Sequence, residues 1–198
     1  MSDEEQFGPI IDAKNVDWAI KNNCIVNYNI VCMMNSMEEI RNIYESIDFE
    51  VLCIKKITYS KKELFFAAYN TLKSLDEGFV SHLLIYTNRQ DTADIVEKII
   101  NNLLDKNIFD NLKKDNIYNK SLHSASNIDL KTEVNKFEES HMGIISCVYI
   151  FGEGFDLPKL NGVVIGEQMT SDIRIVQSCL RPNRLEKDNE NKKAYIII

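Results

Sequence analysis

Two arginines near the end of the sequence are the residues best suited to bind a phosphate group. Arg181 and Arg184 lie in the segment SDIRIVQSCLRPNRL, residues 171–185, with Gln177 one helical turn before Arg181. All three would share one face of a helix, although Pro182 predicts that the helix ends at Arg181. We therefore expect both arginines to project from a helix end, at the carboxyl edge of a sheet. Guanidinium groups bind phosphate oxygens through paired hydrogen bonds. A solvated basic helix end is the alternative.

A loop with two glycines is the second candidate for a binding site. It reads FGEGFDLPKL, residues 151–160, and follows an apolar run. Gly152 and Gly154 permit tight turns, Asp156 can accept hydrogen bonds from a ligand, and Pro158 fixes the exit of the chain. The pattern is not G-x-G-x-x-G and no helix follows it, which disfavours a dinucleotide-binding loop. A purely structural loop is the alternative.

The third candidate lies between an apolar strand and a helix. The segment YTNRQDTAD places Thr87, Asn88 and Arg89 at that junction. Side-chain donors and the free backbone N–H groups of a helix N-terminus suit a phosphate. Plain capping of the helix is the alternative.

Other catalytic chemistry is disfavoured by what the sequence lacks. His82, His123 and His141 are scattered without metal-ligand spacing, so we predict no metal site. There is no G-x-S-x-G nucleophile motif. There is also no G-x-x-x-x-G-K-[ST] loop and no D-E-x-[DH] box. Phosphoryl transfer needs a phosphate cradle, a magnesium ligand and a residue that orients water, so this chain alone should not hydrolyse ATP.

Composition predicts one globular domain, or one domain with an appendage. The 198 residues are 44% hydrophobic and 27% charged, and the net charge of −7 excludes a polycation that coats nucleic acid. No apolar run reaches the roughly 18 residues of a membrane span, and the acidic N-terminus is unlike a signal peptide. Five cysteines without a C-x-x-C pair predict an intracellular, reducing compartment.

Strands and helices that alternate along the chain must position these candidate residues. Apolar runs of strand length alternate with helical segments, which predicts a mainly parallel sheet in a three-layer α/β sandwich. Ligands of such sheets bind outside the carboxyl ends of the strands. We predict strands at 7–11, 27–33, 82–87, 117–123, 143–150, 162–165 and 194–198, and helices near 17–21, 38–47, 61–75, 90–104, 134–137 and from 171.

In this order, the three candidate segments resemble the second RecA-like domain of superfamily 2 helicases. The sixth motif of that family, Q-x-x-G-R-x-x-R, aligns with Gln177 to Arg184, and its fifth, E-G-x-D-x-P, aligns with Glu153 to Pro158. LLIYTNRQDTAD resembles the fourth motif. The segment 7–31 is similar to the bridge that enters this domain in the branch related to restriction-enzyme helicase subunits, a branch that includes proteins of large DNA viruses. The resemblance covers nearly the whole chain.

The resemblance implies how the domain and its ligands are organised. Residues 1–35 would form the bridging segment and residues 36–198 a helicase C-terminal domain, together a fragment of a longer protein. ATP and Mg²⁺ would be bound mainly by a first RecA-like domain, which this chain lacks and which would be its partner. The other partner would be single- or double-stranded DNA or RNA, with no membrane involved. The location would be the cytoplasm, a virion or a viral factory.

The resemblance also implies residue roles. Arg181 and Arg184 would act as arginine fingers on the ATP phosphates, with Gln177 lining the same site. Cofactor contacts would come from Glu153, Gly154 and Asp156, and nucleic-acid contacts from Thr87, Asn88, Arg89, His123 and Ser124.

Two departures from the family pattern leave other functions open. Leu180 stands where the sixth motif has glycine, and the threonine that opens the fifth motif is not evident. A catalytically retired nucleotide-binding module with a regulatory or scaffolding role would fit these changes. An unrelated α/β domain whose arginines bind another anion is the third hypothesis.

Overall fold

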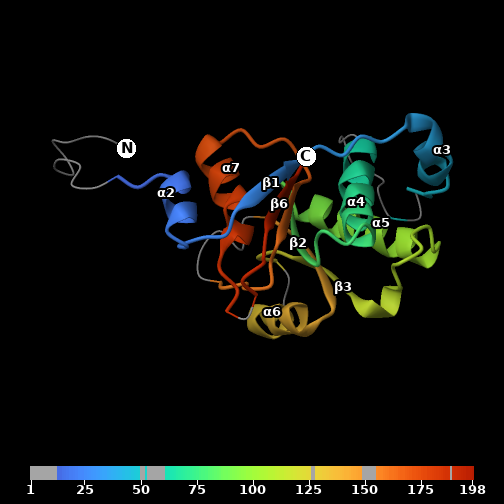
Figure 1. Ribbon diagram of the computed structural model, residues 1–198. Helices are drawn as coiled ribbons and strands as arrows, with labels where there is room; N and C mark the ends of the chain where they lie inside the picture. Colours follow the sequence, from blue (N-terminus) through green and yellow to red (C-terminus); the bar gives the residue numbers. More distant parts are fainter. Residues whose placement is uncertain (1–12, 50–51, 53–60, 126–127, 149–154, 188) are drawn as a thin grey trace.

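The computed structural model of the chain describes residues 13–49, 52, 61–125, 128–148, 155–187 and 189–198. Its apolar runs form a six-stranded, wholly parallel sheet with the strand order β1-β6-β5-β2-β4-β3 (Figure 1). The predicted α/β sandwich is therefore confirmed. The strands are β1 (Tyr28–Val31), β2 (His82–Tyr86), β3 (Ile117–Leu122), β4 (Met142–Cys147), β5 (Gly162–Ile165) and β6 (Ala194–Ile197).

Helices cover both faces of the sheet and form the outer layers. Helices α3, α4 and α5 pack over one face, and α6 and α7 pack over the other. The helices are α2 (Val16–Lys21), α3 (Met37–Glu45), α4 (Lys61–Asp76), α5 (Gln90–Asp105), α6 (Leu130–Glu139) and α7 (Asp172–Cys179), with short 3₁₀ turns η1 (Lys114–Asn116) and η2 (Arg181–Asn183).

The central strand β2 shows why the strands read as apolar throughout. All five of its residues are buried. Leu83 and Ile85 belong to the core under α4 and α5, whereas Leu84 and Tyr86 belong to the core under α6 and α7. Successive side chains of a strand point to opposite faces, so a sheet covered on both sides needs apolar residues at every position.

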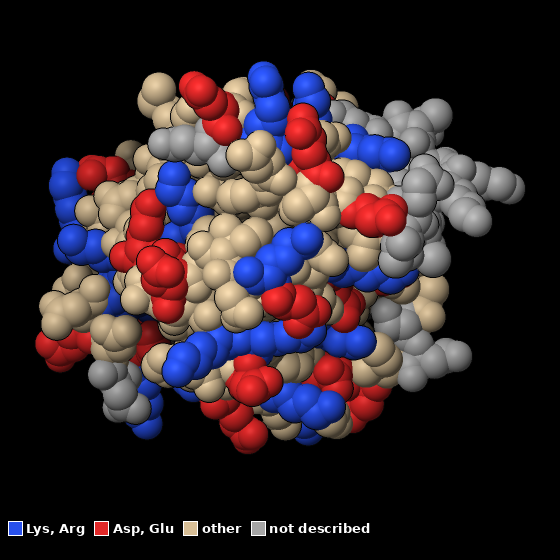
Figure 2. All heavy atoms as spheres, turned by 90° about the vertical axis from the view of Figure 1, so that its right-hand side faces the viewer, with Lys and Arg blue, Asp and Glu red and all other residues tan. Residues whose placement is uncertain are grey.

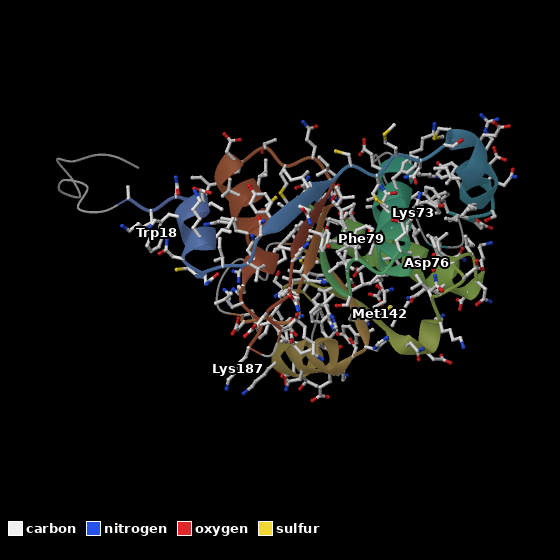
Figure 3. The ribbon with its side chains drawn as sticks, viewed as in Figure 1. Trp18, Lys73, Asp76, Phe79, Met142 and Lys187 are labelled. Carbon is white, nitrogen blue, oxygen red and sulfur yellow. The ribbon has the colours of Figure 1, made fainter. Side chains whose placement is uncertain are left out.

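Polar contacts fasten the segment after β1 to helix α4. The Asn35 side chain donates to Asn70 Oδ1 at 2.6 Å, and Lys73 Nζ donates to Asn35 Oδ1 at 3.2 Å. In Figure 3, Lys73 lies right of centre on α4, whereas Trp18 lies at the left on α2. Helix α2 therefore contributes little to the core, and none of its residues is buried.

The predicted elements agree with the structure wherever it describes the chain, with shifts at their ends. The predicted strand 7–11 and the last residues of the predicted strand 143–150 lie outside the described residues. The predicted boundary near residue 35 falls between β1 and α3, and β1 pairs with β6 in the same sheet. In the described ranges, no helix is both long enough and apolar enough to cross a membrane.

Candidate functional site

Helix α7 carries the arginine segment back across the sheet. It follows the carboxyl end of β5 and runs from Asp172 to Cys179, with Ser171 as its N-cap. The turn η2, which contains Pro182, comes next. Asn183 lies beside the chain that enters β1, because its side chain donates to the Val26 carbonyl at 2.9 Å and its own carbonyl accepts from Val26 N at 2.8 Å.

The expectation that both arginines lie at the carboxyl edge of the sheet is therefore wrong. The connection between two parallel strands must return the chain to the opposite edge. Helix α7 makes that return after β5, so its end lies toward the amino ends of the strands. Because the helix stops before Arg181, the shared helical face predicted for Gln177 and the two arginines does not form either.

Both arginines bind the loop that corresponds to the fifth motif. Arg184 NH1 lies 2.6 Å from Asp156 Oδ1, and Arg181 NH1 donates to the Phe155 carbonyl at 3.2 Å. The structure thus brings together Arg181, Arg184 and Asp156, which the sequence separates widely. Gln177 lies apart, exposed on α7. Glu153 and Gly154 lie outside the described residues.

The ion pair between Arg184 and Asp156 is open to solvent. The Arg184 side chain is 42% exposed and the Asp156 side chain 72%. Exposed pairs of this kind contribute less than about 1 kcal/mol to stability. The Arg184 guanidinium is therefore held near the loop but can exchange the carboxylate for another anion at low cost.

Arg181 is half-buried, and its charge acts on the buried phenol of Tyr86. Burial raises the pKa of Tyr86 well above its ordinary value, while the positive charge of Arg181 and a hydrogen bond with Ser178 act in the opposite direction. Tyr86 is thus a neutral, buried phenol that links the central strand to the end of α7.

A buried lysine, which no sequence pattern indicated, joins the Asp156 loop to the segment that carries Arg184. Lys192 is only 6% exposed. Its ammonium donates to the Pro158 carbonyl and, at 2.9 Å, to the Arg184 carbonyl. Hydrogen bonds of a charged donor contribute about 1.5–3 kcal/mol each, which exceeds the surface ion pair. In the polar run NENKKAY nothing distinguishes Lys192 from its exposed neighbour Lys193.

The five predicted nucleic-acid residues do gather at the carboxyl edge of the sheet. Thr87, Asn88 and Arg89 follow β2, and His123 and Ser124 follow β3. Strand β4 lies between these two strands. A hydrogen bond of 3.0 Å from the Gln90 side chain to Ser124 Oγ nevertheless joins the two loops.

An internal carboxylate occupies the N-terminus of α5, where an anion was expected to bind. Glu167 Oε2 accepts hydrogen bonds from the Asn88 backbone at 2.7 Å and from Thr92 Oγ1 at 2.8 Å. The Asn88 side chain also donates to the Gln168 carbonyl at 2.9 Å. The N-cap residue, Arg89, makes no side-chain capping hydrogen bond. Glu167 thus supplies the negative charge that favours a helix N-terminus.

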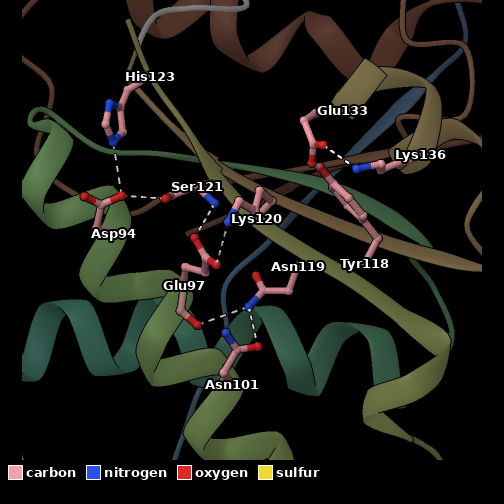
Figure 4. Close-up of polar contacts among 10 residues, drawn as sticks. All are labelled: Asp94, Glu97, Asn101, Tyr118, Asn119, Lys120, Ser121, His123, Glu133 and Lys136. Atoms are coloured by element: carbon pink, nitrogen blue, oxygen red, sulfur yellow. Dashed lines mark hydrogen bonds and ion pairs between the residues drawn. The ribbon is translucent and has the colours of Figure 1, made fainter. Parts of the chain in front are cut away.

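Helix α5 fixes His123 through Asp94 (Figure 4). His123 Nε2 lies 3.1 Å from Asp94 Oδ1, and Ser121 Oγ donates to the same oxygen at 2.5 Å. Serine and histidine both bind the carboxylate, and the arrangement therefore differs from a catalytic triad, in which histidine lies between the other two. Since the His123 side chain is only 11% exposed, it can offer a nucleic acid little more than one edge of its ring.

Carboxylates also cover the edge strand β3. Glu97 accepts a hydrogen bond from Ser121 N at 2.7 Å, and its other oxygen lies 3.6 Å from Lys120 Nζ. An edge strand blocked in this way cannot pair with a further strand at that position.

On the face that Figure 2 turns toward the viewer, Lys and Arg are interleaved with Asp and Glu. That face would not attract a polyanion strongly.

Comparison with solved structures assigns the fold. The chain resembles the ATP-dependent Type ISP restriction-modification enzyme LlaBIII bound to DNA, with a TM-score of 0.71 and 16% identity, over 100% of this chain and 14% of that one. It resembles the fragment structure of a putative HsdR subunit of a type I restriction enzyme from Vibrio vulnificus YJ016, with a TM-score of 0.69 and 18% identity, over 98% and 36%. The chain has the fold of a RecA-like helicase domain.

A third similar structure is T4 UvsW, with a TM-score of 0.51 and 15% identity over 86% of this chain and 31% of that one. This RecA-like domain therefore spans well under two thirds of the proteins it resembles. No protein-family model matches the sequence, and no curated protein matches it.

Proposed function

We propose that this chain is the second motor domain of an ATP-dependent nucleic-acid helicase or translocase. The contact between Arg184 and Asp156 carries the proposal, because it joins the two segments that match the sixth and fifth helicase motifs. The RecA-like fold supports it, as does the likeness to an ATP-dependent enzyme bound to DNA.

In this proposal Arg184 and Arg181 supply positive charge to the phosphates of ATP bound by a first RecA-like domain. The exposure of Arg184 and Asp156 fits such a role, since the guanidinium can leave a solvated carboxylate for a phosphate at low cost. Mg²⁺ and the phosphate cradle would belong to that other domain. The fork of an arginine matches phosphate oxygens in two-point hydrogen bonding, and an arginine finger is worth about 10³–10⁵ in rate.

Asp156 would act as the resting partner of Arg184. While no phosphate is present, the carboxylate holds the guanidinium beside the loop at 2.6 Å. When the domains close, the arginine would turn to the nucleotide, and Asp156 would be released to accept hydrogen bonds from its ribose. Leu180 does not obstruct this arrangement: its backbone has φ −85° and ψ −5°, which any residue can adopt, so glycine is not required there.

The nucleic-acid track would run along the carboxyl edge, past Asn88, Arg89 and Ser124. Contacts from these residues would go mainly to phosphates and would carry little sequence information. Binding by this edge should be weak and sensitive to salt, because Glu167 already occupies the Asn88 N–H.

We also propose a reducing, intracellular location, since Cys24, Cys32, Cys147 and Cys179 are free thiols. The viral source stays a prediction.

The test is ATP turnover of the full-length protein that contains this chain, with and without single-stranded DNA or RNA. We expect turnover to be stimulated by one nucleic acid and to be lost in Arg184→Ala, at unchanged thermal melting. Arg41→Ala, which removes an exposed arginine of α3, is the matched control and should behave as wild type. Turnover that is indifferent to nucleic acid and to Arg184 would contradict the motor function and favour the retired nucleotide-binding module.

A further inference from the structure

Lys192 is a buried cation whose hydrogen bonds go to main-chain carbonyls. It lies between η2 and β6 and is 6% exposed. Its ammonium donates to the carbonyls of Pro158 and Arg184. Within the described part of the chain, no carboxylate lies at ion-pair distance from it. A buried ammonium is unfavourable without partners, so the two carbonyls and the ammonium depend on one another.

The two carbonyls belong to the segments that carry the proposed site. Pro158 follows Asp156 in the loop of the fifth motif, and Arg184 is the second arginine of the sixth. The side chains of Arg184 and Asp156 meet at the surface, whereas Lys192 joins the same two segments beneath them through the backbone. The surface ion pair is solvated and replaceable, so the buried contacts are the ones that can keep the two segments in register.

We propose that Lys192 is a positioning residue, which holds the backbone of Arg184 and of the Asp156 loop so that the Arg184 guanidinium can reach its phosphate. It does not touch the nucleotide itself. The expected effect of Lys192 on ATP turnover rests on the proposed function. The joining of the two segments by Lys192 does not depend on that function.

The experiment compares Lys192→Met, Arg184→Ala and the double variant in the full-length protein, with Lys193→Met as the matched control. Lys193 is adjacent and exposed, so its replacement changes charge equally without the buried contacts. Misplacing a catalytic group by about 1 Å costs roughly 100-fold in rate. We therefore expect Lys192→Met to lower kcat for ATP by about 10- to 100-fold, with KM for ATP changed by less than about threefold.

Two results distinguish positioning from a general loss of stability. The double variant should turn over ATP no more slowly than Arg184→Ala alone, because residues that act through one another are not additive. Hydrogen exchange in segments 155–160 and 181–186 should rise at least about tenfold in Lys192→Met but not in Lys193→Met, with exchange in β2 unchanged. Additive losses in the double variant, or unchanged exchange in the two segments, would overturn the proposal.

The exchange measurement also separates this inference from the proposed function. Raised exchange in Lys192→Met together with turnover that ignores Arg184 would uphold the joining role of Lys192 and refute the arginine finger. If Lys192→Met does not fold, Lys192→Gln takes its place, because glutamine keeps a neutral hydrogen-bond donor. It is then compared by ATP turnover of the double variant and by hydrogen exchange of the two segments.

Discussion

Replacing Glu167 by glutamine should strengthen nucleic-acid binding at the cost of stability. The Glu167 carboxylate accepts hydrogen bonds from Asn88 N at 2.7 Å and from Thr92 Oγ1 at 2.8 Å. A phosphate that used the same donors would lie within about 5 Å of the carboxylate, where like charges repel by roughly 3 kcal/mol at the effective dielectric of a protein surface. Partial exposure and salt reduce this to about 1 kcal/mol, or about fivefold in Kd.

The assay is fluorescence anisotropy of a labelled single-stranded oligonucleotide titrated with the full-length protein at low and moderate salt. Glu167→Gln should bind about fivefold more tightly than wild type at low salt, and the difference should shrink as salt is added. Urea unfolding should show a loss of about 1 kcal/mol, since a charge-assisted hydrogen bond and a favourable helix-terminus charge are both weakened. Glu77→Gln makes the same charge change at an exposed residue after α4 and is the control.

An unchanged or weaker affinity in Glu167→Gln, at a stability that falls as expected, would refute this reasoning. It would mean that the nucleic acid does not approach the N-terminus of α5, and that Asn88 and Arg89 serve only the packing of the two loops.

The other predictions concern the core beneath the site. Burial lowers the pKa of His82 to about 4, against 6.5 for an ordinary histidine. Between these two pH values His82 therefore binds a proton in the unfolded chain but not in the folded chain. The free energy of unfolding should therefore fall as pH drops, by about 2 kcal/mol between near pH 7 and near pH 5. Urea unfolding at several pH values tests this, and a His82→Gln variant whose stability changes with pH as much as that of the wild type would contradict it. In Gly143→Ala the new Cβ would lie 2.5 Å from the Phe137 ring and 2.9 Å from His82, so urea unfolding should show a loss of about 1–3 kcal/mol. Unchanged stability would show that α6 can shift.

Much of the fold follows from local pattern, and β2 and α5 show why. Every residue of β2 is apolar or aromatic except the terminal His82, and the β4 residues paired with it are also buried. The apolar stripe of α5 predicted its range almost to the residue, because a helix packed on a sheet must bury one face. The resemblance implied that Asp156 and Arg184 both contact the nucleotide, but it did not predict the ion pair between them.

The parts of the site that escaped prediction depend on long-range contacts. Lys192 is buried because carbonyls from Pro158 and Arg184 meet there, and a lysine in a polar run gives no local sign of such partners. Glu167 reaches the N-terminus of α5 only because β5 lies beside β2. The arginines lie toward the amino ends of the strands because α7, which precedes them, runs antiparallel to the strands.

In the proposed function Arg184 stabilises the transition state of ATP hydrolysis, and single-turnover kinetics measure that stabilisation. The full-length protein, saturated with nucleic acid, is mixed with a substoichiometric amount of ATP, and the rate of cleavage is compared with ATP affinity for wild type, Arg184→Ala and Arg41→Ala. We predict a rate lower by at least about 10³-fold in Arg184→Ala, with ATP affinity changed by less than about tenfold and Arg41→Ala like wild type. Cleavage by Arg184→Ala at the wild-type rate would contradict the claim.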